Sequence, residues 1–196
     1  MENDYNNQTG EDTAKPDGGR GFSAGVYEWA ESLVFAIVVV VLIFSFIFRV
    51  VTVNGESMLP NYHQDDRLIV SAVAPEIEQG DVVVVVDVLD DPIIKRVVAT
   101  QGQTVDIHDG SVYVDGVRFD DEGYNVGRGI TTTGITSLST LEFPQVVPEG
   151  CVFVLGDNRS VSRDSRYTDV GMVDERKILG KALLNIYPFD KFGLSK

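Results

Sequence analysis

Ser57 is the first residue whose surroundings suggest chemistry. It stands in the stretch Val-Asn-Gly-Glu-Ser-Met-Leu-Pro at residues 53–60, shortly after a long apolar run. Asn-Gly favours a tight turn, so a hairpin with a solvent-facing Ser57 is one interpretation. Pro60 removes a backbone donor soon after the turn, which disfavours a regular return strand. The stretch is not a nucleophile elbow, because Leu59 occupies the place of the second glycine in G-x-S-x-G.

Lys95 is a candidate partner for this serine. In the apolar stretch of residues 93–99, successive side chains of a strand point to opposite faces, so Lys95 shares a face with Val97, and Arg96 shares the other with Val98. One of the two cations must then lie against apolar neighbours, unless the strand is at an edge. A lysine snorkelling from an edge strand is the structural alternative. A desolvated lysine that loses its proton near neutral pH would instead be a general base, as in known Ser-Lys pairs.

The third stretch, residues 156–166, is dense in polar groups and reads Gly-Asp-Asn-Arg-Ser-Val-Ser-Arg-Asp-Ser-Arg. A solvated loop is the structural alternative. The functional interpretation is a set of hydroxyl and charged groups that hold the lysine in place. Asp164 and Arg166 are two residues apart, so on an extended segment they face one side and could pair.

Composition limits the partners of the chain. Its 196 residues carry a formal net charge of −14, which argues against nucleic acid or an anionic membrane surface as the main partner. The single cysteine, Cys151, cannot form an intrachain disulfide, and its apolar neighbours indicate a buried thiol in a strand. A catalytic cysteine would need a nearby histidine, and only His63 and His108 are present.

The N-terminal part predicts a membrane anchor. Residues 1 to about 25 are acidic and polar, which predicts a disordered tail. Residues 33–48 are apolar except for Ser45, and the flanking apolar residues make the run long enough to span a bilayer. A cleaved signal peptide is disfavoured by the long acidic lead and the bulky end of the run, and a buried soluble helix by the lack of a polar face. The basic residues on the two sides are nearly balanced, so charge alone leaves the orientation open.

After residue 50 the chain consists of short β-rich pieces bounded by turn residues. We expect strands at residues 67–70, 82–86, 93–99, 105–107, 111–114, 151–155 and 182–186. Residues 174–179 predict a short helical or irregular turn, and residues 120–143 a long surface excursion. No long helical period occurs outside the apolar run, so the fold class is mostly β, with one transmembrane helix before the β domain.

These stretches together resemble the bacterial type I signal peptidases in their single-span form. Residues 57–60 match the family's S-M-x-P motif, residues 95–97 its K-R-V motif, and residues 156–166 its late motif G-D-N-R-x-x-S-x-D-S-R. Residues 80–84 match its G-D-V-V-V strand. S-M-x-P alone is weakly specific, but four motifs in this order and spacing are highly specific. The resemblance spans the apolar run and essentially the whole β-rich region, and it implies an antiparallel, barrel-like β domain.

The resemblance implies a role for each site residue. Ser57 resembles the nucleophile and Lys95 the general base, while Ser162 resembles the hydroxyl that orients the lysine. The remaining orienting residues would be Asp157, Asp164, Arg166 and Arg96, and the substrate-binding residues Val53, Gly55, Met58, Ile93 and Ile94. Val53 and residues 93–94 would flank the substrate as strands, and Met58 and Ile94 would help form the shallow pocket for small side chains. The oxyanion hole would use the backbone N–H of Ser57. Some members add a hydroxyl two residues earlier, where this chain has Gly55, so backbone donors or water must serve. Asn61 stands where threonine usually follows the proline, and we expect it to affect only the neighbouring loops.

The resemblance also implies the reaction and its setting. The chain would be a membrane-bound serine endopeptidase that removes signal peptides from secretory preproteins, cutting after small residues, with neither cofactor nor metal. Residues 1–28 would form a cytoplasmic tail, 29–49 the transmembrane helix, and 50–196 an extracytoplasmic catalytic domain in a single-pass protein of the cell membrane. The bilayer would be a partner and nucleic acid would not.

The sequence disfavours three other interpretations. A catalytically inactive, membrane-tethered β module that binds extended peptides is disfavoured by the intact Ser57 and Lys95. A self-cleaving repressor of the Ser-Lys kind is disfavoured by the apolar span and the acidic charge. The endoplasmic reticulum form of the family is disfavoured because it has histidine where Lys95 stands.

Overall fold

The computed structural model describes residues 20–73, 76–126 and 139–195. The chain divides into two compact units, residues 1–43 and residues 44–196. Most of helix α1 makes up the described part of the first unit, and all of the strands belong to the second.

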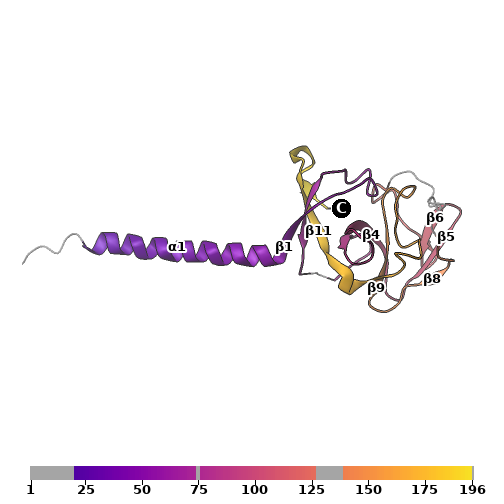
Figure 1. Ribbon diagram of the computed structural model, residues 1–196, viewed down its shortest axis with the longest axis horizontal. Coiled ribbons are helices and arrows are strands. Elements are labelled where there is room, and N and C mark those ends of the chain that lie inside the picture. Colours follow the sequence, from indigo (N-terminus) through magenta and orange to yellow (C-terminus); the bar gives the residue numbers. More distant parts are fainter. Residues whose placement is uncertain (1–19, 74–75, 127–138, 196) are drawn as a thin grey trace, which may run out of the picture. The chain divides into compact units, whose positions relative to one another are not determined.

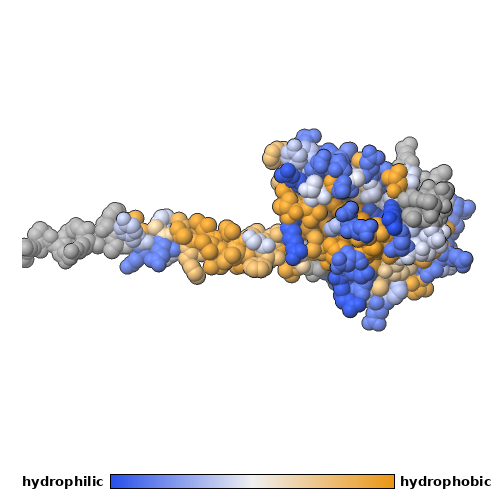
Figure 2. All heavy atoms as spheres, viewed as in Figure 1, coloured by the Kyte–Doolittle hydropathy of each residue, from blue (hydrophilic) through white to orange (hydrophobic). Residues whose placement is uncertain are grey.

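Helix α1 spans Arg20–Ile47. Within it, Gly25–Ile47 is long and apolar enough to cross a membrane, and Figure 2 shows hydrophobic residues along most of this stretch. Its 23 residues correspond to about 35 Å of helix, against a hydrocarbon layer of about 30 Å. The prediction of one apolar helix long enough to span a bilayer is therefore confirmed.

The bounds of the helix differ from the expected ones. α1 begins at Arg20, so residues 20–28, which were expected to belong to the tail, are helical. The reason is that adding one residue to an existing helix costs far less free energy than nucleating a new helix. Residues 1–19 lie outside the described residues. At the other end the helix stops at Ile47, and β1 (Phe48–Thr52) follows, although its valines were counted with the apolar run. Antiparallel pairing with β2 (Arg67–Ser71) keeps these β-branched residues extended.

The β unit contains two antiparallel sheets. In the larger sheet the strand order is β1-β2-β11-β3-β4-β9-β10, and β12 pairs with β11 as an eighth strand. The remaining strands of this sheet are β3 (Val82–Val85), β4 (Ile93–Thr100), β9 (Cys151–Leu155), β10 (Val173–Asp174), β11 (Ile178–Tyr187) and β12 (Gly193–Leu194). The smaller sheet has the order β7-β6-β5-β8, formed by β5 (Thr104–His108), β6 (Ser111–Val114), β7 (Val117–Arg118) and β8 (Gln145–Val146). Figure 1 shows β5, β6 and β8 gathered on one side of this unit, with β4 and β9 between them and β11.

All seven predicted strands are present, and the mostly β fold is confirmed. The segment at residues 174–179 contains the 3₁₀ helix η1 (Glu175–Lys177), as expected, and the last strand, β11, is longer than predicted. The strands missed by the sequence analysis are β1 and the two-residue strands β7, β8, β10 and β12. A second 3₁₀ helix, η2 (Phe189–Lys191), follows β11. Of the predicted surface excursion, residues 127–138 lie outside the described residues.

The position of β3 explains its run of valines. β3 lies between β11 and β4, and all four of its valines are buried. Val82 and Val84 belong to one core cluster, and Val83 and Val85 to another on the opposite face. A strand covered on both faces needs no polar alternation, so the run is continuously apolar.

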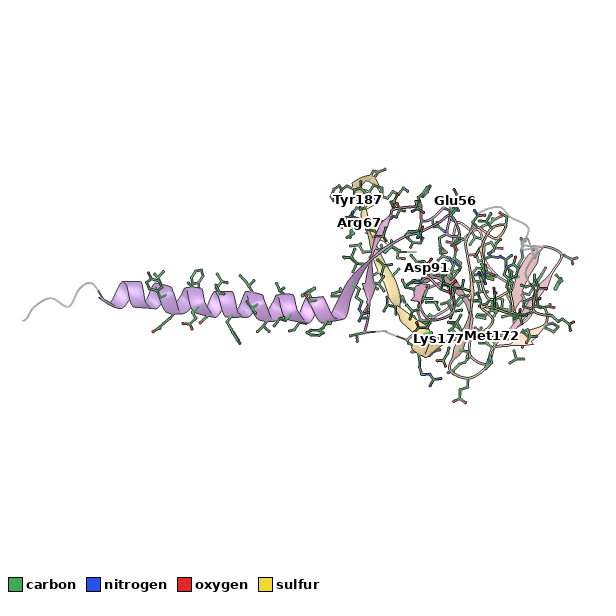
Figure 3. All side chains as sticks on the ribbon, viewed as in Figure 1. Glu56, Arg67, Asp91, Met172, Lys177 and Tyr187 are labelled. Atoms are coloured by element: carbon green, nitrogen blue, oxygen red, sulfur yellow. The ribbon has the colours of Figure 1, made fainter. Side chains whose placement is uncertain are left out.

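Cross-strand pairing at the far end of β11 is visible in Figure 3, where Arg67 and Tyr187 lie side by side. The two residues are register partners in β2 and β11, and the Arg67 guanidinium lies 5.3 Å from the centre of the Tyr187 ring. This end of the sheet packs next to the turn of residues 62–66. The Nζ of Lys191 in η2 lies 2.9 Å from His63 Nδ1 and 3.6 Å from Asp66 Oδ1.

Candidate active site

Ser57 and Lys95 meet in the structure. Ser57 lies in the loop between β1 and β2, and Lys95 is the third residue of β4. The Nζ of Lys95 lies 2.9 Å from the Oγ of Ser57 and donates a second hydrogen bond of 2.9 Å to the carbonyl of Ile94. A hydroxyl and an amine at this distance can exchange a proton, so the pair has the geometry of a nucleophile and its base.

The serine is held from two sides. Within its own loop, Leu59 N–H donates to the Glu56 carbonyl and Tyr62 N–H to the Met58 carbonyl, which fold the stretch into consecutive turns. From the late segment, Asn158 N–H donates to the Ser57 carbonyl at 2.9 Å. In the part of the chain that the structure describes, no residue accepts a hydrogen bond from the Ser57 N–H, so this donor is available.

Lys95 lies on an internal strand rather than an edge strand. β4 is paired with β3 on one side and with β9 on the other, and Lys95 is only 3% exposed. Burial lowers the pKa of Lys95 from 10.5 to about 8, an effect that Asp164 and Asp157 oppose and Arg166 reinforces. The snorkelling alternative is thereby excluded. Arg96, on the opposite face, is fully buried as well, so both cations are internal.

Two buried ion pairs account for the carboxylates nearest the lysine. Arg96 holds Asp157 through two hydrogen bonds, Nε to Oδ1 at 2.8 Å and Nη2 to Oδ2 at 2.7 Å. Arg166 holds Asp164 in the same way, at 2.8 and 3.0 Å. These two-point pairs leave each carboxylate matched by a guanidinium, so neither pairs directly with Lys95. The predicted pairing of Asp164 with Arg166 is confirmed, and Asp157 pairs with Arg96.

Ser162 is placed differently from expectation. It is fully buried, and among the side-chain atoms that the structure describes its Oγ is buried without a hydrogen-bond partner. The expected bond to Lys95 is therefore not formed in this structure. A tight contact explains the position: a Cβ on Gly156 would lie 2.2 Å from Ser162 Oγ and 2.5 Å from the Ser57 carbonyl oxygen. Gly156 thus lets the late segment and the serine loop lie directly against each other.

Most of the predicted substrate-binding residues lie in one core cluster or at the start of β4. Val53, Met58 and Ile94 are buried members of one core cluster, and Ile93 begins β4. Residues 93–95 pair with β3 alone, because β9 joins β4 only from Arg96 onward. Val53, however, lies one residue beyond β1, and its N–H already donates to the Asp66 carbonyl at 2.8 Å, so it does not offer a free strand edge.

Gly55 adopts a backbone that other residues avoid. Its φ is +90°, and its N–H donates to the Gln64 side chain at 2.5 Å. A cavity of about 340 Å³ opens beside it, lined by Asn54, Gly55, Leu89, Asp90, Asp91, Pro92, Ile93 and Arg163. Asp91, labelled in Figure 3, belongs to the loop that leads into β4. This cavity lies between the serine loop and the start of β4.

Several residues without a predicted role in the site also support it. The loop that carries Asp157 is tied to the serine loop by Asn158, whose side chain donates to the Glu56 carbonyl at 3.2 Å. Asn61 donates to Asp157, and Arg159 is buried and paired with Asp121 at 2.7 Å. The signal for Asn158 was available, because it is a fixed member of the late motif. None was available for Asp121, whose partner is 38 residues away.

Comparison with known proteins agrees with this geometry. The family model described as signal peptidase, peptidase S26, matches residues 26–187. The chain belongs to this signal peptidase family. Signal peptidase IB of Staphylococcus aureus (strain COL) is 34% identical over 178 residues, which cover 85% of this chain and 92% of that protein. Signal peptidase I of Bacillus licheniformis is 31% identical over 170 residues, covering 85% and 91%.

One solved structure is similar to part of this chain. The crystal structure of a signal peptidase I from Enterococcus faecalis V583 has 29% identity and a TM-score of 0.43, covering 55% of this chain and 97% of that chain. Membership of the signal peptidase family confirms the resemblance drawn from the motifs, and with it the prediction that the chain is a serine peptidase.

Proposed function

We propose that this chain removes signal peptides from secretory preproteins, with Ser57 as the nucleophile and Lys95 as the general base. The observation that carries the proposal is the 2.9 Å approach of the Lys95 amine to the Ser57 hydroxyl, made by a lysine that is 3% exposed. Membership of the signal peptidase family supports the same substrate class.

The reaction follows from the positions of the two groups. Neutral Lys95 takes the proton of the Ser57 hydroxyl as its oxygen attacks the scissile carbonyl. The negative charge on that carbonyl oxygen is stabilised by the Ser57 N–H, which the serine loop leaves available. Protonated Lys95 then gives its proton to the leaving amine, which becomes the N-terminus of the mature protein. Lys95 next deprotonates a water molecule, which hydrolyses the acyl-serine ester and restores Ser57.

The charged residues around the pair leave Lys95 without a direct salt bridge. Because Arg96 and Arg166 each match one carboxylate, neither Asp157 nor Asp164 forms a salt bridge that would fix the ammonium form of Lys95. We propose that Ser162 orients Lys95 during the reaction. An unpartnered buried hydroxyl costs on the order of 1–3 kcal/mol, and a bond to the lysine in the reacting state would recover that cost.

The substrate would bind as an extended strand along Ile93 and Ile94. Residues 93–95 have β3 on one side only, which leaves room for an added strand on the other. Val53, Met58 and Ile94 would form the apolar floor that admits small side chains before the cut, with Gly55 beside it.

The setting at the membrane is part of the proposal. Gly25–Ile47 would anchor the protein in the bilayer, with a cytoplasmic N-terminal tail and residues 50–196 outside. A preprotein whose own apolar segment lies in the same bilayer meets a tethered enzyme at a high effective concentration. The net charge of −14 disfavours nucleic acid as a partner.

The test is cleavage of a preprotein by the purified full chain in detergent, with the cut mapped to the bond by mass spectrometry. Ser57→Ala should abolish cleavage and leave the melting temperature nearly unchanged, because one partly exposed hydroxyl contributes little to stability. A covalent serine-directed probe should label the wild type and not the variant. Retained cleavage by Ser57→Ala would remove Ser57 from the mechanism, and no labelling of the wild type would favour the inactive peptide-binding module.

A further inference from the structure

Asn61 joins three parts of the chain that surround the candidate active site. It lies in the serine loop, four residues after Ser57, and is partly buried. Its Nδ2 donates to Asp157 Oδ2 at 2.7 Å and to the Tyr124 carbonyl at 2.9 Å, with a longer contact of 3.4 Å to the Asn125 carbonyl. Its Oδ1 accepts from the Asn125 side chain at 3.1 Å. The side chain therefore uses both its donor and its acceptor, on partners more than sixty residues away.

The Asp157 carboxylate is fully engaged as a result. Oδ1 accepts from Arg96 Nε, and Oδ2 accepts from both Arg96 Nη2 and Asn61 Nδ2. Asp157 is also one of the two carboxylates close enough to affect Lys95, the other being Asp164, which Arg166 holds. If Asp157 rotated away from Arg96, its negative charge would no longer be matched, and it would favour the ammonium form of Lys95 more strongly. Asn61 opposes that rotation, because its hydrogen bond holds Oδ2 of Asp157 in place beside Arg96.

The hydrogen bond from Asn61 to the Tyr124 carbonyl holds a segment that lies over the Arg96–Asp157 ion pair. By binding the Tyr124 carbonyl, Asn61 fixes residues 119–126 above Arg96, whose guanidinium lies 5.1 Å from the centre of the Tyr124 ring. The Phe119 and Tyr124 rings stack at 5.2 Å, and Asp121 in the same segment pairs with buried Arg159. This aromatic cover keeps water from Arg96 and Asp157, and an ion pair shielded from water is held more firmly.

We propose that Asn61 is a positioning residue that locks Asp157 onto Arg96 and holds residues 119–126 over that pair, so that the Asp157 charge stays matched by Arg96 and does not favour the ammonium form of Lys95. The proposal rests on the proposed role of Lys95 as the general base. The charged groups that act on Lys95 are Asp157, Asp164 and Arg166, and its amine contacts the Ser57 hydroxyl and the Ile94 carbonyl.

The decisive measurement is the pH dependence of kcat/KM for the full chain in detergent, on a peptide that spans a signal-peptide cleavage site. Asn61→Ala should move the acid limb upward by about half to one pH unit, which corresponds to roughly a threefold to tenfold loss at pH 7. Asn61→Asp places a carboxylate against Asp157, so it should move the limb at least as far. Asn61→Thr keeps one side-chain donor for Asp157 and should restore most of the wild-type profile.

Asn125→Ala is the matched control, because it removes the donor to Asn61 Oδ1 while leaving both Asn61 donor bonds in place. Its acid limb should coincide with that of the wild type. If the role of Asn61 were only structural, its substitution would lower kcat or the melting temperature at every pH and leave the midpoint of the acid limb unchanged. That result in both Asn61→Ala and Asn61→Asp would overturn the proposal. If Asn61→Ala does not fold, Asn61→Asp and Asn61→Thr decide by the same criterion: an unmoved midpoint in Asn61→Asp refutes it.

Ser57→Ala assayed in parallel separates the two levels of failure. Cleavage by Ser57→Ala, or none by the wild type, contradicts the proposed function. An active wild type, an inactive Ser57→Ala and an unmoved acid limb in the Asn61 variants contradict only the role of Asn61.

Discussion

The state of Lys95 yields the sharpest prediction. Its pKa is lowered from 10.5 to about 8, chiefly by burial, so the ammonium is destabilised by roughly 3 kcal/mol relative to an exposed lysine. At pH 7 about one molecule in ten then carries a neutral amine, against about one in three thousand for an exposed lysine. Because the pKa is lowered and the neutral form is the base, kcat/KM should rise with pH, reach half its maximum near pH 8 and level off above.

The assay is cleavage of a peptide that lacks groups titrating between pH 6 and 10, measured at low and at saturating substrate. Low substrate reports the free enzyme, and saturating substrate reports the complex, in which the bound peptide adds burial and should lower the midpoint further. Lys95→Arg should be inactive at every pH, because a guanidinium keeps its proton.

Lys95→Met is the matched control for folding. It has nearly the same length and no charge, so it should be inactive while its melting temperature equals or exceeds that of the wild type, since no charge has to be buried. An acid limb with its midpoint near 10.5, or measurable activity in Lys95→Arg, would refute the neutral-amine mechanism.

Three other predictions follow from the site and the anchor. Ser162→Ala should slow cleavage tenfold to a hundredfold, as expected for one lost orienting bond, yet keep or raise the melting temperature, because the hydroxyl has no partner in the resting structure; unchanged kinetics would mean that packing alone holds Lys95. Gly156→Ala should destabilise the protein by about 1–3 kcal/mol in urea unfolding and reduce cleavage, because the new Cβ would lie 2.5 Å from the Ser57 carbonyl oxygen; wild-type stability would show that the serine loop moves freely. Protease added to spheroplasts should degrade residues 50–196 and spare a tag at residue 1, and the reverse pattern would invert the proposed topology.

Local patterns predicted most of the β architecture, because alternation, β-branched runs and turn residues act over a few positions. They could not place β4 inside its sheet. The second partner of β4 is β9, which joins it from Arg96 onward and lies more than fifty residues further along the chain. Nor could they separate the end of the apolar helix from β1, since the same valines suit both and the pairing with β2 decides between them.

The candidate site was likewise only partly predictable from local sequence patterns. Ser57, Lys95 and the two arginine–carboxylate pairs could be predicted from the motifs that carry them. Asn61 was noted only as a departure beside the serine motif and was expected to affect loops alone. Its bond to Asp157 joins positions 96 residues apart, and no local pattern indicates such a contact. The resting position of Ser162 depends on the close approach of Gly156 to the serine loop, which only the folded backbone shows.

The start of β4 also bears on the fidelity of the cut. Residues 93–95 contain both the backbone edge along which a substrate strand would bind and Lys95 itself. The distance from the bound peptide to the Lys95 amine is therefore fixed by the covalent geometry of a single strand. A peptide that slips by one residue turns its small side chains away from the apolar floor, whereas a slip of two restores the facing. Errors in cleavage should therefore occur in steps of two residues, and a sequence with small residues at alternate positions would be the one that this enzyme cuts at more than one bond.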